Sequence, residues 1–390
     1  MKWATAIAEE KDLEQAVAAA GEELSTRLGT EQPDLLVAFA AGYGSSARAR
    51  LGDLLGRTLP ARVRLGCSAG GVIGGGREVE GSAALSLMGA VLPDVRLVPL
   101  SLRPGAMPRD AAGWRELVGI AAEERPAFVL LGEPFSCDAQ ALAEGLDGAY
   151  PGAVKVGGLA SGGRTRGAHT LWLGESMQTD GAVGVACAGA MTVDTIVAQG
   201  CRPIGQPMFV TAAEGGVLRA LNGRPVLEVL RELYESLEER DRALMQHALF
   251  FGVVMDETRQ EYQLGDFLVR HVVGMLPEKE GVIVGGELRQ YQVVQFHLRD
   301  ASTSSEELVA LLRRYREAPD RPQPVGALLF SCLGRGIGLY GVPDHDSRRF
   351  QEAFGDVPLG GFFGNGEIGP VGGRTYLHGY TSAFGLFSPR

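Results

Sequence analysis

Glycine gathers in short runs between apolar segments, and this feature most limits how the chain can fold. The sequence has 56 glycines among 390 residues, about twice the usual share. A glycine costs backbone entropy, so it is expected where φ must be positive or where another group must approach the main chain closely. The runs therefore predict several specialised turns rather than low-complexity filler.

Three of these runs stand at the same place in a repeated pattern. In each copy a buried strand is followed by a loop, a helix, a second strand, a Gly-rich turn and an outer strand pair. The turn follows the first strand residue by 31, 30 and 33 positions, from Leu35 to Gly66, Ala127 to Gly157 and Ala327 to Gly360. Because a helical crossover implies parallel pairing, the pattern predicts an α/β fold with mixed sheets built from repeated β-loop-α-β units.

The stretch between the second and third copies has a different texture. A charged amphipathic helix is predicted over 228–247, and short strands follow it at 267–271, 281–284 and 292–297. Extended chain rich in Gly and Pro precedes the helix, over 210–225. We therefore expect two related α/β domains, 1–215 and 216–390.

Charge and cysteine content exclude several kinds of partner and site. A net charge of −10 at pH 7 argues against nucleic acid and anionic membrane surfaces as partners. The five cysteines are scattered without a CxxC pair, which argues against a disulfide framework and a structural zinc site. Residues 1–15 form a polar stretch without the apolar centre of a signal peptide, and the first strand is expected only at Leu35. These features predict a cytoplasmic protein with no metal site.

Eight short motifs along the chain carry a family resemblance. The first three are GCSAGGVIG at 66–74, VGGLASG at 156–162 and QGCRPIG at 199–205. The other five are GDFLVR at 265–270, FHLRD at 296–300, FSCLGRG at 330–336, GFFGNGEIGP at 361–370 and LHGYT at 377–381. In this order they resemble the FIST family, as paired FIST N and FIST C domains over about residues 30 to 387.

The resemblance implies a sensory or signal-transduction protein that binds small molecules such as amino acids and passes the signal to a protein partner. Two alternatives remain open. Some bacterial relatives are haem-binding gas sensors, for which His271 and His297 would be the ligand candidates here. Eukaryotic relatives join an F-box and act as adaptors, although the short segment before Leu35 leaves no room for one. We predict no cofactor and no enzymatic activity, and the sequence does not indicate an oligomeric state.

The densest polar cluster lies in the third repeat and consists of Arg335, Asn365, Glu367, Arg374 and His378. Arg335, flanked by Gly334 and Gly336, and Glu367 each follow the end of a predicted strand. If these strands are neighbours, the two side chains face one crevice. A guanidinium can grip a ligand carboxylate there, while Glu367 holds an ammonium group, which would suit a free amino acid. The alternative is that Arg335 and Glu367 bridge each other and brace the turns.

Two further turns are candidate anion sites because small residues expose their backbone N–H groups. They comprise Ser68, Gly70 and Gly71 in the first repeat and Ser161 and Gly162 in the second. The alternative is a tight connection between strands and nothing more. Cys67 and Cys332 end matching strands, where a lowered thiol pKa would make either one reactive; otherwise they are small buried hydrophobes.

A dinucleotide site is the main rival interpretation. Gly336, Gly338 and Gly341 form a GxGxxG pattern between a strand and a helix. The acidic residue expected at the end of the next strand is missing over 358–363, which argues against NAD.

Overall fold

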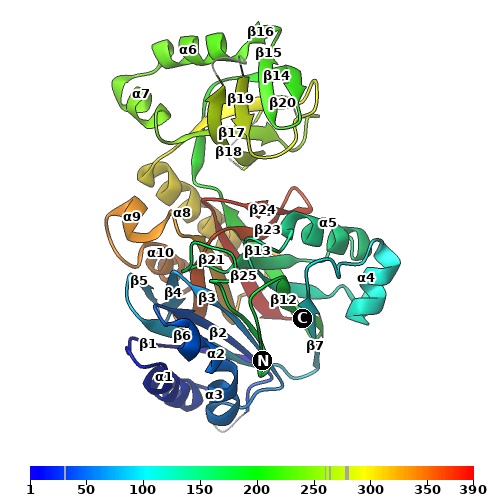
Figure 1. Cartoon of the computed structure of the whole chain (residues 1–390), viewed down its shortest axis with the longest axis vertical. Coiled ribbons are helices and arrows are strands. Elements are labelled where there is room, and N and C mark those ends of the chain that lie inside the picture. Colours follow the sequence, from blue (N-terminus) through cyan, green and yellow to red (C-terminus); the bar gives the residue numbers. More distant parts are fainter. Residues whose placement is uncertain (30–31, 260, 263–264, 277–280) are drawn as a thin grey trace. The chain divides into compact units, whose positions relative to one another are not determined.

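The chain forms two compact units in the computed structural model (Figure 1). The structure describes residues 1–29, 32–259, 261–262, 265–276 and 281–390. Unit 1 comprises Met1–Val197 together with Val309–Arg390, and unit 2 comprises Ala198–Leu308. This division differs from the predicted boundary at residue 215, because the third repeat packs with the first two and the stretch between them forms a body of its own.

Unit 1 contains three six-stranded sheets that share one strand order. From one edge of the sheet to the other, each has two strands, then a pair of parallel strands, and then a two-stranded hairpin. The first sheet is β1 (Lys2–Ala8), β6 (Ala84–Val91), β2 (Leu35–Ala41), β3 (Val63–Ala69), β10 (Leu171–Leu173) and β11 (Ser176–Gln178). The second is β7 (Val95–Leu102), β12 (Ala182–Gly189), β8 (Ala127–Gly132), β9 (Lys155–Leu159), β23 (Glu367–Val371) and β24 (Arg374–His378). The third is β13 (Met191–Ala198), β25 (Ser382–Pro389), β21 (Gly326–Cys332), β22 (Leu359–Gly364), β4 (Gly71–Gly74) and β5 (Arg77–Glu80).

The predicted repeat is confirmed, with one addition that the sequence did not show. The pairs β2–β3, β8–β9 and β21–β22 are parallel, as expected. The outer hairpin of each repeat, however, joins the sheet of a neighbouring repeat. Hairpin β4–β5 of the first repeat pairs with β22, β10–β11 of the second pairs with β3, and β23–β24 of the third pairs with β9. The three repeats are therefore interlocked in a cycle, and the α/β class with mixed sheets is confirmed.

One glycine in each parallel pair explains part of the glycine excess. Gly66, Gly157 and Gly360 were predicted to lie in turns, but they lie within strands β3, β9 and β22. Gly66, Gly157 and Gly361 lie opposite Ala38, Leu130 and Leu329 in the strand register. A Cβ atom added to any of these glycines would lie 1.9–2.0 Å from the carbonyl oxygen of its partner. The two strands can approach in this way only because the position has no side chain.

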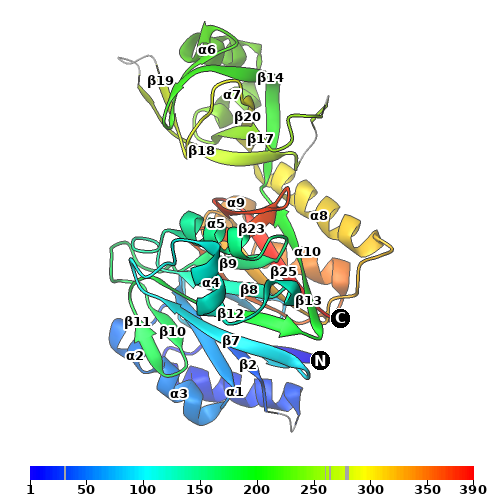
Figure 2. The ribbon, with the colours of Figure 1, turned by 90° about the vertical axis from the view of Figure 1, so that its right-hand side faces the viewer.

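The helices of unit 1 cover the outer faces of the sheets (Figures 1 and 2). They are α1 (Leu13–Leu28), α2 (Ser45–Ala49), α3 (Leu51–Thr58), α4 (Ala111–Val118), a 3₁₀ turn (Ala122–Glu124), α5 (Ala139–Ala149), α9 (Gly336–Tyr340) and α10 (His345–Phe354). A further helix, α8 (Ala301–Glu317), begins in unit 2 and ends in unit 1. The expectation that the first strand begins at Leu35 is wrong, since β1 and α1 precede it. The apolar residues of α1 recur at helical spacing and its N-cap Asp12 accepts two backbone N–H groups, so the sequence carries a helix signal over 13–28 that the prediction overlooked.

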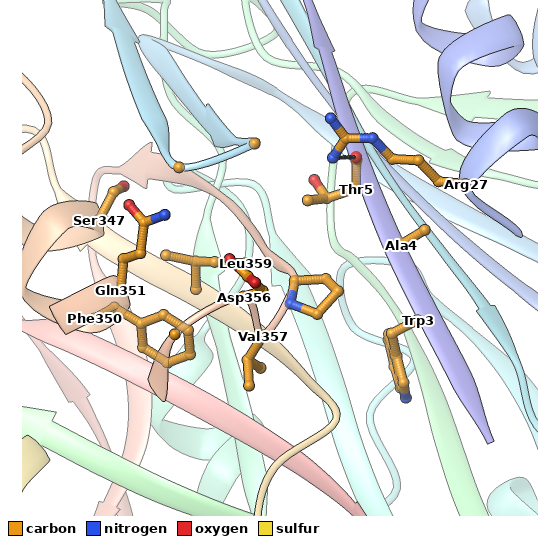
Figure 3. A pocket seen from close by; sticks show the side chains of 14 residues that line it. Trp3, Ala4, Thr5, Arg27, Ser347, Phe350, Gln351, Asp356, Val357 and Leu359 are labelled. Atoms are coloured by element: carbon orange, nitrogen blue, oxygen red, sulfur yellow. Dashed lines mark hydrogen bonds between the residues drawn. The ribbon is translucent and has the colours of Figure 1, made fainter. Parts of the chain in front are cut away.

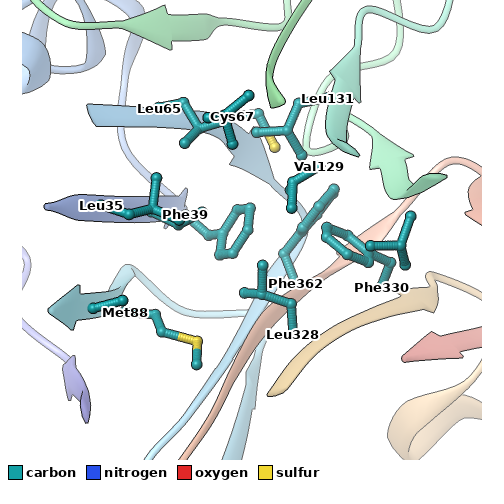
Figure 4. Packing of buried hydrophobic residues seen from close by; sticks show 14 of the residues in the cluster. Leu35, Phe39, Leu65, Cys67, Met88, Val129, Leu131, Leu328, Phe330 and Phe362 are labelled. Atoms are coloured by element: carbon teal, nitrogen blue, oxygen red, sulfur yellow. The ribbon is translucent and has the colours of Figure 1, made fainter. Parts of the chain in front are cut away.

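The inner faces of the three sheets share one hydrophobic core (Figure 4). Phe39 from β2 stacks on Phe362 from β22 at a centroid distance of 4.7 Å, and Phe330 from β21 meets both rings edge-on. Val129 and Leu131 of β8 join the same cluster. Burial of these rings and branched side chains supplies the main stabilisation of the unit.

Unit 2 is an antiparallel barrel. Its strands follow the order β14 (Cys201–Glu214), β20 (Val293–Arg299), β17 (Leu249–Val254), β18 (Phe267–Leu276), β19 (Gly281–Val284), β15 (Val217–Leu221) and β16 (Arg224–Pro225). Pairing of β14 with β15 closes the ring. The helix predicted over 228–247 forms as two pieces, α6 (Val226–Ser236) and α7 (Glu239–Met245), because Leu237 adopts an extended conformation. In the described part of the chain, every helix is too short or too polar to cross a bilayer.

Candidate functional site

The three Gly-rich turns meet and hydrogen-bond to one another. Ser161 Oγ accepts the Gly70 N–H at 2.7 Å and donates to the Phe363 carbonyl oxygen. Ser68 Oγ donates to the Ser161 carbonyl at 3.3 Å and accepts the Thr170 N–H at 3.1 Å. The structure therefore brings the predicted turn residues together as a mutual brace. Groups that could have received an anion already serve the contacts between repeats.

The junction is packed so closely that the remaining turn glycines have no room for a side chain. A Cβ on Gly162, which has a φ of +85°, would lie 2.5 Å from the Ala69 carbonyl oxygen. A Cβ on Gly70 or Gly71 would meet Leu333 or the Val79 carbonyl oxygen at less than 3 Å. These positions satisfy the structural alternative, a tight connection between strands, whereas anion binding there stays a prediction.

Arg335 lies at the centre of a buried charged cluster. Its Nε donates to Asp346 Oδ2 at 2.9 Å and its Nη2 donates to Asp346 Oδ1 at 3.2 Å and to the Tyr340 hydroxyl at 2.5 Å. Arg335 is 0% exposed and Asp346, from α10, is 2% exposed. Burial alone would raise the pKa of Asp346, but the Arg335 guanidinium and hydrogen bonds from His345 and Ser382 outweigh it and hold that pKa below its usual range. The ion pair joins the residue that caps α9 to the first turn of α10.

Glu367 takes different partners from Arg335. Its Oε2 accepts the Thr381 N–H at 3.1 Å, and the neighbouring Ser382 hydroxyl donates to Asp346 at 2.5 Å. Glu367 is also 0% exposed. Thr381 and Ser382 therefore connect Glu367 to the Arg335–Asp346 pair through a layer of buried polar groups. The structure shows this layer where the sequence suggested an open crevice. Ligand contact by Arg335 and Glu367 stays a prediction.

The neighbours of Glu367 serve main-chain groups. Asn365 Nδ2 donates to the Ala160 carbonyl at 2.9 Å, which ties the third turn to the second. His378 lies opposite Glu367 in the β23–β24 pairing, and its Nε2 donates to the Gly369 carbonyl at 3.0 Å. Both contacts stabilise the hairpin and the turn junction.

A second acidic side chain, Glu78 of β5, is pinned to α10 beside this cluster. Glu78 Oε1 accepts both the N–H of Ser347 at 2.7 Å and its hydroxyl at 3.0 Å, while the Glu78 N–H donates to Asp344 at 2.6 Å. Burial, and after it the negative charge of Asp346, raise the pKa of Glu78 to about 8. We call this arrangement, one Ser or Thr donating N–H and O–H to one carboxylate, a hairpin pin.

Glu78 should make the folded protein less stable as the pH rises. Its pKa of about 8 lies above the ordinary value of 4.5, so folding takes up a proton between these values and stability falls as the pH rises through the folded pKa. We expect the melting temperature to decline from pH 5 to 8 and Glu78→Gln to flatten that decline. A fluorescence melt at each pH measures it. Glu352→Gln, an exposed carboxylate on α10 that pairs with Arg349, is the control. An unchanged slope in Glu78→Gln would contradict the assignment.

The cysteine and dinucleotide candidates are constrained by their surroundings. Burial raises the pKa of the Cys67 thiol well above its usual value, which keeps it protonated. Cys332 is half-buried, and its backbone N–H donates to the Thr381 carbonyl. At the start of α9, Glu80 accepts the Ile337 N–H at 2.9 Å, and a Cβ on Gly336 would lie 2.2 Å from the same carboxylate. The Glu80 carboxylate therefore occupies the glycine turn in which a dinucleotide phosphate would have to bind. Gly334 lies in the same turn, directly before Arg335.

The haem-ligand candidates lie in the barrel. His297 is 1% exposed; a Cβ on Gly252 would lie within 2.3 Å of its ring, and Phe267 packs edge-on against it. Burial lowers the pKa of His297 to about 4, which is the behaviour of a packed neutral imidazole. His271 is exposed on β18, where its ring lies against Phe250.

A hollow of about 320 Å³ opens beside the Glu78 pin (Figure 3). We call it the Arg27 hollow. One wall carries Arg27 of α1 with Trp3 and Thr5 of β1, and the other carries Gln351 of α10 and Asp356 of the loop after it (Figure 3). The complete lining is Trp3, Ala4, Thr5, Arg27, Gly75, Gly76, Ser347, Phe350, Gln351, Gly355, Asp356, Val357, Pro358 and Leu359.

Two buried polar atoms of this wall lack a protein partner. Trp3 Nε1 and Thr5 Oγ1 make no hydrogen bond within the described chain, although the side chains are 5% and 3% exposed. A buried polar group normally has a partner, so these two atoms are exceptions within the wall of the hollow. Arg27 donates to the Thr5 carbonyl at 2.9 Å and to Glu23 at 2.5 Å, which holds the guanidinium at the rim.

Comparison with known proteins assigns the chain to a family. The FIST N domain model matches residues 34–224, and the FIST C domain model matches residues 227–370. The chain belongs to the FIST family. FIST domains are sensory or signal-transduction domains. The predicted resemblance is therefore confirmed. The two family models divide the chain near residue 225, whereas the compact units divide it at 197–198 and 308–309.

Among FIST relatives, two mycobacterial proteins match along almost their full length. Uncharacterized protein Rv0628c of Mycobacterium tuberculosis is 34% identical over 388 residues, covering 99% of this chain and 100% of that protein. Uncharacterized protein Mb0898c of Mycobacterium bovis is 35% identical, with 99% of each chain covered. The F-box/LRR-repeat protein At5g63520 of Arabidopsis thaliana is 26% identical over 203 residues, 46% of this chain and 37% of that protein.

Sequence reasoning missed several residues that build these FIST sites. Asp346 is not among the predicted site residues, yet it is the buried partner of Arg335. Arg27 and Asp356 come from opposite ends of the chain, so no local pattern could pair them. The wholly buried pair of Glu133 and His169, 3.0 Å apart, also escaped notice; an acidic residue directly after the buried strand β8 was the available signal.

Proposed function

We propose that this FIST protein is a sensor that binds a small zwitterionic metabolite, such as a free amino acid, in the Arg27 hollow. The observation that carries the proposal is the placement of a guanidinium and a carboxylate, Arg27 and Asp356, on its two walls (Figure 3). The guanidinium would take the ligand carboxylate and Asp356 would take the ammonium group.

The size and lining of the hollow support this ligand class. A volume of about 320 Å³ is at the lower end of the range for small-molecule sites, about 300–1,000 Å³. The Gln351 amide offers hydrogen bonds, while Trp3, Phe350 and Val357 offer apolar contact. Glycines at positions 75 and 76 leave main chain open to a ligand.

The same lining supports binding without catalysis. Its residues include no cysteine or histidine, and its charged groups have opposite signs, as expected for holding a zwitterion. The walls come from the first and third repeats, so an occupant would tighten contact between α1 and α10. Such differential stabilisation is what a ligand needs to shift a conformational equilibrium.

Thermal shift with the proteinogenic L-amino acids tests the proposal, followed by calorimetric titration of every compound that raises the melting temperature. Arg27→Gln should weaken binding by at least about tenfold, because a charge-assisted hydrogen bond contributes about 1.5–3 kcal/mol. Asp356→Asn should act similarly. The matched control is Arg57→Gln, which also removes an exposed guanidinium paired at i−4, with Asp53. Failure of every amino acid to stabilise the protein, or wild-type affinity in Arg27→Gln, would refute the proposal.

A further inference from the structure

A second hollow, of about 450 Å³, lies at the equivalent junction of the next sheet. We call it the Arg374 hollow. Its walls are the exposed face of α5 and the β23–β24 hairpin, and its lining is Gln140, Glu144, Asp147, Gly148, Pro151, Gly152, Gly373, Arg374, Thr375 and Tyr376. The Arg374 hollow lies between the β23–β24 hairpin and α5, the helix of the repeat whose sheet that hairpin joins. The Arg27 hollow lies where the β4–β5 turn meets α10 in the same way, with α1 and β1 as its other wall.

Both junctions contain a hairpin pin, but the carboxylate lies on the hairpin in one and on the helix in the other. At the first, Glu78 of the hairpin accepts the N–H and O–H of Ser347 on the helix. At the second, Asp147 of the helix accepts the N–H of Thr375 at 2.7 Å and its O–H at 2.8 Å on the hairpin. Lys155, which is 0% exposed, donates to the same Asp147 at 2.7 Å. The floor of the Arg374 hollow is therefore fixed and its central carboxylate is already satisfied.

The two hollows also offer the same set of chemical groups. The Arg27 hollow has an aromatic ring, a guanidinium, a carboxylate, a Gln amide and a glycine turn, from Trp3, Arg27, Asp356, Gln351 and 75–76. The Arg374 hollow has its own version of each group, from Tyr376, Arg374, Glu144, Gln140 and Gly373. These groups come from non-equivalent positions in the repeats, so the likeness lies in the chemistry of the sites and is not a consequence of sequence repetition alone.

The third junction is closely packed at two glycines of its helix. There α3 lies against the β10–β11 hairpin, and a Cβ on Gly52 would be 2.9 Å from the Gly174 carbonyl oxygen. A Cβ on Gly56 would meet the Arg64 guanidinium at 3.0 Å. Glycine thus lets α3 approach the hairpin closely at this junction, whereas at the other two junctions a hollow lies beside the hydrogen bonds that join helix and hairpin.

We infer that the Arg374 hollow is a second binding site for the same class of small zwitterion. Arg374 is exposed at its rim and would take the ligand carboxylate. Glu144 accepts one hydrogen bond, from Gln140 at 2.8 Å, and remains exposed, so it would take the ammonium group while the Tyr376 ring packs beside the ligand. The ligand class rests on the proposed function; the existence of the site rests on the geometry of this junction. Arg374 was singled out in the sequence, but with partners from the Arg335 cluster.

Equilibrium dialysis with labelled proteinogenic L-amino acids tests the inference, because it counts bound molecules. The wild type should saturate at two per chain. Arg374→Gln and Glu144→Gln should each leave one, with the remaining affinity unchanged, and the double variant Arg27→Gln/Arg374→Gln should leave none. Arg103→Gln, which removes an exposed guanidinium paired with Asp180, is the control and should leave two. Far-ultraviolet circular dichroism confirms that each variant is folded.

The outcomes separate this inference from the proposed function. Saturation at one molecule per chain that Arg374→Gln does not alter, but Arg27→Gln abolishes, would overturn the second site and retain the first. Binding that Arg374→Gln abolishes and Arg27→Gln leaves intact would support the Arg374 hollow and refute the Arg27 hollow. If no amino acid binds, both fail.

Discussion

Replacing Asp346 with alanine is expected to lower the free energy of unfolding by about 3–5 kcal/mol, since removal of one partner leaves a buried charge without compensation. Arg335 is 0% exposed and makes two hydrogen bonds to this carboxylate. The His345 ring and the Ser382 hydroxyl would lose the same acceptor. Urea denaturation followed by circular dichroism measures the change.

The control for this variant is Asp53→Ala, which breaks an exposed pair with Arg57 and should cost less than about 1 kcal/mol. A second variant distinguishes the loss of the ion pair from the cost of leaving the Arg335 charge buried without a partner. Replacing both residues, as Arg335→Met/Asp346→Leu, should recover much of the stability, because an apolar substitute of similar volume avoids the desolvation of both ions. A loss below about 1 kcal/mol in Asp346→Ala would show that the cluster does not anchor α10.

Introducing a side chain at Gly157 is expected to prevent formation of the native second sheet. The added Cβ would lie 1.9 Å from the Leu130 carbonyl oxygen, far inside contact distance, so β8 and β9 would have to separate. Overpacking of a core typically costs about 1–3 kcal/mol, and a clash with backbone in a parallel pair should exceed that range. We expect Gly157→Ala to be largely insoluble, or to melt well below the wild type in a fluorescence thermal scan.

The matched control is Gly338→Ala. Gly338 lies in α9, and a Cβ added there would meet no other atom within 4 Å; in a helix alanine is favoured over glycine by about 1 kcal/mol. This variant should be at least as stable as the wild type. Gly66→Ala and Gly361→Ala should behave like Gly157→Ala, because they hold the same position in the other two parallel pairs. Tolerance of alanine at Gly157 would contradict the close-approach explanation.

The repeat could be predicted from sequence because its evidence is local. Runs of apolar residues, a helical crossover and glycine runs recur at similar spacing, and β2 and β8 begin at Leu35 and Ala127 as the pattern predicts. Parallel pairing followed from the helical crossover. The exchange of hairpins between sheets could not be predicted, since β4, β10 and β23 each choose a partner strand far away in the sequence.

The candidate site was harder to predict for the same reason. The sequence indicated that Arg335 and Glu367 were unusual among their glycines, and both are indeed wholly buried. It could not show which carboxylate would reach Arg335, and Asp346 on the next helix does so. The Arg27 hollow joins the first helix of the chain to the last one, a juxtaposition that exists only after the three sheets have closed around their shared core.

Fluorescence of Trp3 tests the central claim, ligand binding in the Arg27 hollow, most directly. The chain has three tryptophans, and replacing Trp114 and Trp172 with phenylalanine leaves Trp3, in the wall of the hollow, as the only indole. Titration with an amino acid that raises the melting temperature should shift or quench the Trp3 emission along the binding curve, and Arg27→Gln should displace that curve to higher concentration. Saturation of the protein with no change in Trp3 emission would place the ligand elsewhere and contradict the account.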